Sequence, residues 1–321
     1  MKRKLFGTVW AAALTVWLSI SAFAAQTLIP VGQVVGISLE NGTVTVAGFD
    51  EGMGDAARDS GLRVGDRICA VDGRTVASAR DLLQALEHSD GRVTLRLDRD
   101  GSSVELHMEP ASTAYGPRLG VYVREGITGI GTVTYYDPQT GDFGALGHGV
   151  SDARGALAAM ETGKVYRARV TGVKPGRAGA PGQLLGDVQT QGVLGSIGRN
   201  TSFGIFGTCE GFAGEALPIA GAGKLHTGKA QILSNISGQE VETFSVEIVK
   251  LFDPEQHTGR DLMLHVTDPR LLEATGGIVA GMSGSPILQD GCLVGAVTHV
   301  LVNDPTRGYG ISVENMLEAA G

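Results

Sequence analysis

The sequence predicts a mainly β protein made of an N-terminal export or anchor helix, a small α+β domain and a larger all-β domain. Two features of the composition favour strands over helices. Glycine contributes 49 of the 321 residues, whereas aromatic residues make up only 5% of the chain. Short runs of valine and isoleucine recur between glycine-containing turns, and this pattern is typical of short strands joined by tight turns.

Residues 1–27 form the first segment and carry the features of an export signal. The basic run Met1–Lys4 precedes an apolar stretch from Leu5 to Ala25, and a positive flank followed by an apolar core directs export. Ala22-Phe23-Ala24 supplies a small-x-small cleavage site. Because the apolar stretch is nearly long enough to span a bilayer, a cleaved signal peptide and a retained membrane anchor both remain open.

Residues 28–110 form the second segment, in which strand-like runs surround a glycine-rich motif. The motif reads G-L-x-x-G-D-x-I-x-x-V-D-G from Gly61 to Gly73, and an amphipathic helix is expected from Ala79 to His88. This combination resembles a PDZ domain of the bacterial protease type. Such a domain binds a peptide, often by its C-terminus, as an extra strand beside an exposed edge. The residues expected to form this groove are Val34, Val35, Gly36 and Ile37. A domain that only packs against its neighbour is the alternative.

Residues 111–321 form the third segment, which is almost free of helical patterns. The run from Asp137 to Gly141 is a strong turn signal between two strand-like runs, and only Val313–Ala320 is predicted as a clear helix. Because short strands need their edges paired or covered, this domain is expected to close on itself.

A serine between glycines is the strongest chemical signal in the third segment. Gly281-Met282-Ser283-Gly284-Ser285-Pro286 precedes an apolar run, a setting that exposes a serine Oγ and brings backbone N–H groups beside it. The run resembles the G-D-S-G-G-P loop of chymotrypsin-like peptidases. The resemblance implies a chymotrypsin-like double β-barrel, Ser283 as nucleophile, and an oxyanion hole built from the N–H groups of Gly281 and Ser283. A polar turn without a chemical role is the alternative.

His148 is the histidine that we expect to act as general base. It lies between two glycines at the end of a strand-like run, where its side chain can turn toward a partner. An order of histidine, aspartate and serine along the chain matches that of chymotrypsin-like enzymes. His299, just past the nucleophile loop, is a candidate for a supporting role.

Asp268 is the acid that we expect to hold the imidazole of His148 in the correct tautomer. It stands at the end of a strand-like run and directly before Pro269. Asp152 and Asp253 are alternatives that the spacing leaves open.

The third segment also resembles the stage IV sporulation protein B peptidase family, and the first two segments follow that family's domain order. The runs that carry the resemblance are Gly144–Gly149, Thr267–Pro269, Thr275–Pro286 and Thr298–Pro305. The family's triad maps onto His148, Asp268 and Ser283. The resemblance implies a protease exported to the space between mother cell and forespore. There it would cleave a membrane-bound inhibitor complex, trigger processing of a late sigma factor, and cut its own N-terminal region.

Other classes of function find little support in the composition. The net charge of −8 comes without a basic stripe, which argues against a nucleic-acid partner. Three distant cysteines without a C-x-x-C pair argue against a disulfide framework, and no spacing indicates a metal site or a cofactor. A non-catalytic peptide-binding scaffold on a peptidase fold and a general protein-quality-control protease remain as alternative functions.

Overall fold

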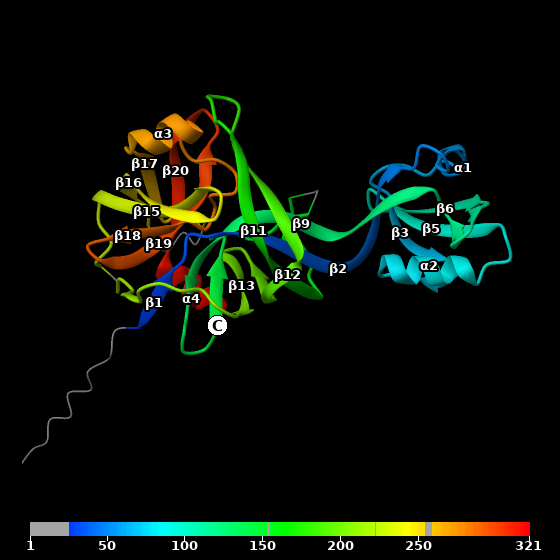
Figure 1. Ribbon diagram of the computed structural model, residues 1–321, viewed down its shortest axis with the longest axis horizontal. Coiled ribbons are helices and arrows are strands. Elements are labelled where there is room, and N and C mark those ends of the chain that lie inside the picture. Colours follow the sequence, from blue (N-terminus) through cyan, green and yellow to red (C-terminus); the bar gives the residue numbers. More distant parts are fainter. Residues whose placement is uncertain (1–25, 153–154, 222, 254–258) are drawn as a thin grey trace, which may run out of the picture.

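The computed structural model describes residues 26–152, 155–221, 223–253 and 259–321. A larger body of two β-barrels and a smaller domain lie side by side, joined by the long strands β2 (Val34–Phe49) and β9 (Val121–Tyr136) (Figure 1). The expected export or anchor helix falls within residues 1–25, outside the described residues. Within the described ranges no helix is long and apolar enough to cross a membrane.

The first barrel is a ring of six antiparallel strands. β2 pairs with β9, and the pairing continues through β10, β13, β12 and β11 back to β2. Its core includes Val35, Ile37, Val133 and Phe143, which are contributed by strands that alternate buried and exposed positions. The bounds of the other four strands are β10 (Asp142–Ala145), β11 (Thr162–Lys174), β12 (Gln183–Thr201) and β13 (Gly204–Cys209).

The second barrel is also closed, and its core is continuous with residues of the first. Ile232, Phe244 and Val297 from the second barrel share one buried cluster with Val34 and Leu184 from the first. This shared cluster makes the two barrels one packed unit. The strands of the ring, in pairing order, are β15 (Gly228–Ser237), β16 (Glu240–Leu251), β17 (Leu262–Val266), β20 (Asp304–Ser312), β19 (Cys292–Leu301) and β18 (Pro286–Gln289).

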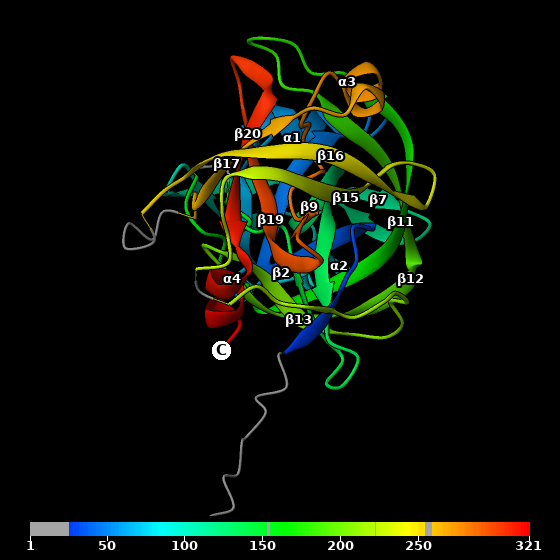
Figure 2. The same cartoon turned by 90° about the vertical axis from the view of Figure 1, so that its left-hand side faces the viewer.

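Two helices lie at opposite ends of the second barrel (Figure 2). α3 (Pro269–Thr275) begins after the N-cap residue Asp268, and α4 (Val313–Ala320) is the C-terminal helix that the sequence predicts. Three short pairings complete the edges: β1 (Thr27–Pro30) lies between β9 and β14 (Leu217–Pro218), and β7 (Ala111–Thr113) pairs with β8 (Gly116–Arg118).

The smaller domain is built around its own apolar core. Ile68, Val71, Leu86 and Leu95 are buried there, and the predicted turn at Asp72-Gly73 has the two positive φ angles, 49° and 80°, of a tight hairpin. The far halves of β2 and β9 complete its sheet. Its remaining elements are α1 (Asp55–Asp59), β3 (Arg67–Val71), β4 (Arg74–Thr75), α2 (Ala79–Glu87), β5 (Val93–Arg99) and β6 (Ser102–Met108).

The smaller domain is inserted into the first barrel rather than placed before it. Residues 28–39 were expected in the smaller domain, but they run through β1 and the barrel half of β2. Leu39 pairs with Ile127, and four residues of β2, 40–43, then stand opposite the single residue Gly126, an excess of three. Gly126 has a φ of 60°, and a Cβ there would lie 1.9 Å from the Leu39 carbonyl oxygen. Only glycine therefore allows the two strands to pass from one domain to the other at this point.

Candidate active site

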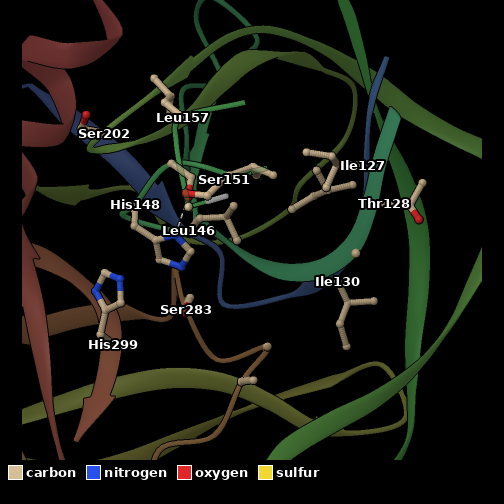
Figure 3. Close-up of a pocket in the computed structure, with 17 residues that line it drawn as sticks. Ile127, Thr128, Ile130, Leu146, His148, Ser151, Leu157, Ser202, Ser283 and His299 are labelled. Carbon is tan, nitrogen blue, oxygen red and sulfur yellow. Dashed lines mark hydrogen bonds between the residues drawn. The ribbon is translucent and has the colours of Figure 1, made fainter. Parts of the chain in front are cut away.

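A cavity of about 650 Å³ lies where the two barrels meet. The first barrel contributes apolar side chains, including Ile127, Ile130 and Leu146, together with His148 (Figure 3). The second barrel contributes Ser283 and His299. Residues that the sequence separates by more than a hundred positions therefore meet at one cavity.

The loop that carries Ser283 is anchored on the first barrel by two buried threonines. Thr132 donates from its backbone N–H to the Ser283 carbonyl oxygen at 3.0 Å and from its hydroxyl to the Gly281 carbonyl oxygen at 2.8 Å. Thr134 donates to the Gly284 carbonyl oxygen at 2.8 Å. A Cβ on Gly284, whose φ is 96°, would lie 2.0 Å from the Thr132 carbonyl oxygen. The glycine therefore lets the loop approach β9 closely.

Only one of the two serines in this loop faces the cavity. The Ser283 hydroxyl donates to the Thr298 carbonyl oxygen at 2.6 Å, whereas Ser285 is fully buried and donates to the Ser234 hydroxyl at 3.2 Å. Met282, between glycine and the nucleophile candidate, is buried in the core of the second barrel. The geometry therefore favours Ser283 over Ser285 as nucleophile.

Two backbone N–H groups beside Ser283 have no acceptor among the described residues, which an oxyanion hole requires. The N–H groups of Met282, Gly284 and Ser285 all donate to carbonyl oxygens within the protein. The N–H groups of Gly281 and Ser283 have no such acceptor among the described residues. They remain available to a developing oxyanion, which is stabilised by preorganised donors.

His148 enters the cavity after a left-handed turn. Leu146 and Gly147 have φ angles of 70° and 68°, and they turn the chain out of β10. His148 Nδ1 lies 2.9 Å from the Gly149 carbonyl oxygen. Because a carbonyl can only accept, Nδ1 carries the proton and Nε2 keeps its lone pair. Burial lowers the pKa of His148, so the ring is neutral at neutral pH and can act as a base beside Ser283 (Figure 3).

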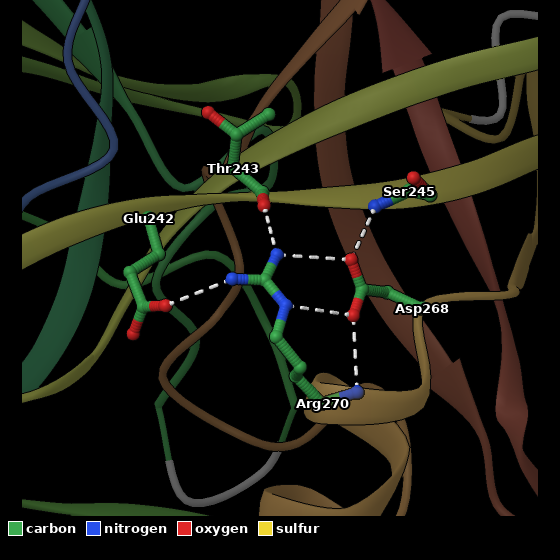
Figure 4. Close-up of polar contacts among 5 residues, drawn as sticks. All are labelled: Glu242, Thr243, Ser245, Asp268 and Arg270. Atoms are coloured by element: carbon green, nitrogen blue, oxygen red, sulfur yellow. Dashed lines mark hydrogen bonds and ion pairs between the residues drawn. The ribbon is translucent and has the colours of Figure 1, made fainter.

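Asp268 does not orient His148 in this structure, contrary to the expectation. Its carboxylate accepts hydrogen bonds from the Ser245 N–H at 3.1 Å, the Arg270 N–H at 3.0 Å and the Arg270 guanidinium at 3.1 and 3.2 Å (Figure 4). The hydrogen bonds from Arg270 hold its pKa at about 2. The motif match identified the residue, but its side chain caps α3 and ties that helix to β16.

Among the described residues, the imidazole of His148 forms a hydrogen bond with the Gly149 carbonyl oxygen and no ion pair. No described carboxylate therefore takes the place of Asp268 beside His148. The alternative Asp152 accepts a hydrogen bond from the Ala156 N–H at 3.1 Å. Neither Asp152 nor Asp253 is among the described residues that line the cavity.

His299 is the side chain that packs against the ring of His148. Its ring centroid lies 4.8 Å from that of His148, with the planes tilted by 37°. Burial, the neighbouring His148 and Arg260 together lower the pKa of His299 to about 4. The sequence indicated only that His299 follows the nucleophile loop, because the contact joins the two barrels.

The predicted peptide groove at Val34–Ile37 is wrong. Those residues lie in the barrel half of β2, where β9 pairs with one edge and β11 with the other. A strand with both edges paired cannot accept a peptide strand. Ile37 lines the catalytic cavity instead.

The smaller domain does have a strand edge without a described partner. The segment of β9 from Val121 to Glu125 pairs only with β2, and the Glu125 carboxylate accepts a hydrogen bond from the Ala79 N–H at the start of α2. The run Leu119-Gly120-Val121, in which Gly120 has a φ of 71°, precedes this edge. It could have indicated this edge from the sequence, because glycine permits the turn that precedes the strand.

Comparisons with known proteins match two parts of the chain. The SpoIVB peptidase S55 family model matches residues 115–317, and a PDZ domain model matches residues 34–109. The Rv3671c protease of M. tuberculosis, solved in an active form, aligns with 61% of this chain and 75% of its own at 14% identity and a TM-score of 0.34. Its inactive form aligns with 60% and 84%, at 14% identity and a TM-score of 0.35.

Two curated relatives that bear the name of a zinc metalloprotease match a smaller part of the chain. R01501 of Rhizobium meliloti is 31% identical over 101 residues, and Atu1380 of Agrobacterium fabrum is 32% identical over 111 residues. The matches cover 31% and 34% of this chain, which spans only 26% and 28% of the length of those relatives. In the described part of this chain, no group of three or more histidine, cysteine, aspartate or glutamate residues could hold a metal ion.

Proposed function

The chain belongs to the SpoIVB peptidase S55 family, and on that premise we propose that it is an exported regulatory serine endopeptidase in which Ser283 is the nucleophile and His148 the general base. Family membership makes it a serine peptidase, and it carries a PDZ domain. The observation that carries the residue assignment is the meeting of His148 and Ser283 at one cavity, beside two N–H groups with no acceptor among the described residues.

The reaction follows from the protonation state of the base. Nε2 of His148 takes the proton from Ser283 Oγ as Oγ attacks the scissile carbonyl, and the N–H groups of Gly281 and Ser283 stabilise the oxyanion. The resulting imidazolium gives the proton to the leaving amine. Water then releases the acyl group by the same steps in reverse order. In the structure the Ser283 hydroxyl donates to Thr298, so it must first rotate away from that carbonyl.

The proposed substrate is a protein at a membrane surface, and the PDZ domain is proposed to capture a peptide end. The proposed location is the space between mother cell and forespore, where cleavage of a membrane-bound inhibitor would trigger processing of a late sigma factor. Self-cleavage near the N-terminus belongs to the same proposal. Family membership and the basic, apolar N-terminal sequence support it.

A fluorophosphonate probe tests the catalytic assignment. We expect the wild-type protein to be labelled, the label to be lost in Ser283→Ala, and the label to be kept in Ser285→Ala. An unlabelled wild-type protein that still binds peptides would support the scaffold alternative instead.

Mass spectrometry of the mature N-terminus tests export and self-cleavage together. A terminus shared by wild type and Ser283→Ala shows whether the signal is cleaved or retained as an anchor, and we expect a further shortened form in the wild type only. Identical termini in the two proteins would contradict self-cleavage. Efficient digestion of unfolded casein would favour a quality-control role.

A further inference from the structure

We propose that His299 is the positioning residue of this active site: its ring packs against the imidazole of His148 and holds it at Ser283. The inference rests on the proposed function, since it presupposes that His148 is the base. In a serine–histidine–aspartate triad the acid fixes the tautomer of the imidazole, orients its ring and stabilises the imidazolium that forms. Here these tasks fall to two other groups.

The tautomer is set by the backbone. His148 Nδ1 donates to the Gly149 carbonyl oxygen at 2.9 Å, so Nε2 is the unprotonated nitrogen. A single hydrogen bond to a neighbouring residue leaves the ring free to tilt about that contact, and a second contact is needed to hold its plane.

His299 supplies the second contact from the opposite barrel. It lies in β19 directly after Thr298, whose carbonyl oxygen accepts the Ser283 hydroxyl at 2.6 Å. One strand therefore places both the acceptor of the nucleophile and the ring that lies 4.8 Å from His148. Motion of β19 would displace the acceptor and the positioning ring together.

His299 stays neutral mainly because it is buried. His148 and Arg260 act in the same direction, and all three lower its pKa. When His148 gains a proton during acylation, the neighbouring ring of His299, 4.8 Å away between centroids, is neutral and does not repel the new cation. His299 thus packs against both protonation states of the base.

Kinetics of His299→Ala and His299→Phe test the inference, with fluorophosphonate titration counting the competent sites. Because small displacements of a catalytic group cost up to about a hundredfold in rate, we expect His299→Ala to lower kcat by about ten- to a hundredfold with little change in KM. His299→Phe keeps a packed ring, and we expect its kcat to stay within about fivefold of wild type.

The pH profile separates positioning from a general loss of structure. In His299→Ala water gains access to His148, so the rising limb of kcat/KM should move up by about half a pH unit or more. In His299→Phe the limb should stay where it is. His265→Ala, which removes a histidine of the second barrel that does not line the cavity, should resemble wild type in both measurements.

Two results would overturn the inference. One is a His299→Ala protein with wild-type kcat and an unmoved limb. The other is equal loss in the Ala and Phe variants with no shift of the limb, because packing would then not be the cause. A wild-type protein that the probe fails to label would instead reject the proposed function itself.

Discussion

The Arg270 guanidinium donates hydrogen bonds to both carboxylate oxygens of Asp268, from Nε to Oδ1 at 3.2 Å and from Nη2 to Oδ2 at 3.1 Å. The same guanidinium donates to the Thr243 carbonyl oxygen at 2.7 Å and to Glu242 at 3.3 Å. The pair therefore fastens the start of α3 to β16. It supports the second barrel at a place that does not line the catalytic cavity.

Asp268→Asn should consequently affect stability more than chemistry. Asparagine caps a helix about as well as aspartate, so the substitution should remove only the ion pair with Arg270. We expect the free energy of unfolding to fall by about 1 kcal/mol. We expect kcat per titrated site to fall by less than about tenfold, whereas loss of a triad acid costs about four orders of magnitude. Arg270→Gln is the matched control and should behave alike. A four-order loss confined to Asp268→Asn would restore the triad role.

The stability difference between wild type and Asp268→Asn should depend on pH. The folded-state pKa of Asp268 is about 2, below the value of about 4 for an unfolded chain. Its contribution is therefore fully present above pH 4 and is lost as the pH falls toward 2. Urea unfolding of both proteins across that range measures this. A difference that persists at pH 2 would show that the charge of Asp268 is not its source.

Catalysis should have its own, separate pH dependence. Burial lowers the pKa of His148, and the base must be neutral, so kcat/KM should rise with pH through one titration with a midpoint below the ordinary histidine value of about 6.5. The measurement is kcat/KM on a short peptide from pH 4.5 to 8. A midpoint above 6.5 would mean that His148 is solvated or paired with an acid in solution.

Gly284 and Gly291 offer a matched test of the nucleophile loop. Both residues have positive φ angles, 96° at Gly284 and 75° at Gly291. A Cβ on Gly284 would clash with the Thr132 carbonyl oxygen, whereas a Cβ on Gly291 would have no atom within 4 Å. Gly291→Ala should cost about 1 to 2 kcal/mol of stability from backbone strain alone and keep its labelling. Gly284→Ala should lift the loop off β9 and abolish fluorophosphonate labelling. Equal labelling of the two variants would contradict the close approach to β9.

Much of the chemistry could be predicted from the sequence because it is local. The glycines around Ser283 favour a tight turn whatever the loop packs against, and the local sequence of α4 is sufficient to predict a helix. The role of Asp268 could not be predicted in this way, since a match in chain order does not say which way a carboxylate points. The contact of His299 with His148 joins two barrels, and no local pattern encodes it.

The groove at Val34–Ile37 was predicted wrongly for a related reason. An apolar, β-branched run has the same appearance whether one or both of its edges are paired, and the partners β9 and β11 lie about 90 to 130 residues further along the chain. A continuous strand that serves two domains also leaves no break in composition, so the boundary at Leu39 could not be seen.

Deleting the smaller domain tests that boundary. Leu39 and Ile127 are directly opposed, so a two-residue Asn-Gly turn can replace residues 40–126 and leave an ordinary hairpin. We expect this protein to fold and to label with the probe. Deleting residues 28–110 instead removes β1 except Thr27, together with all of β2, and we expect the resulting protein to be insoluble. If the 40–126 deletion failed to fold while the 28–110 deletion succeeded, the insertion described above would be wrong.

The direct pairing of Leu39 with Ile127 also makes this point of the first barrel a site at which other domains can be inserted. Any module whose two ends leave as neighbouring antiparallel strands can be accommodated there without a flexible tether. β9 is continuous from Val121–Glu125, which pairs with no described strand besides β2, to the cavity wall at Ile127 and Ile130. A binding domain grafted at this point would therefore share one continuous strand with the wall of the active site. A movement of that strand on ligand binding would be transmitted directly to the cavity.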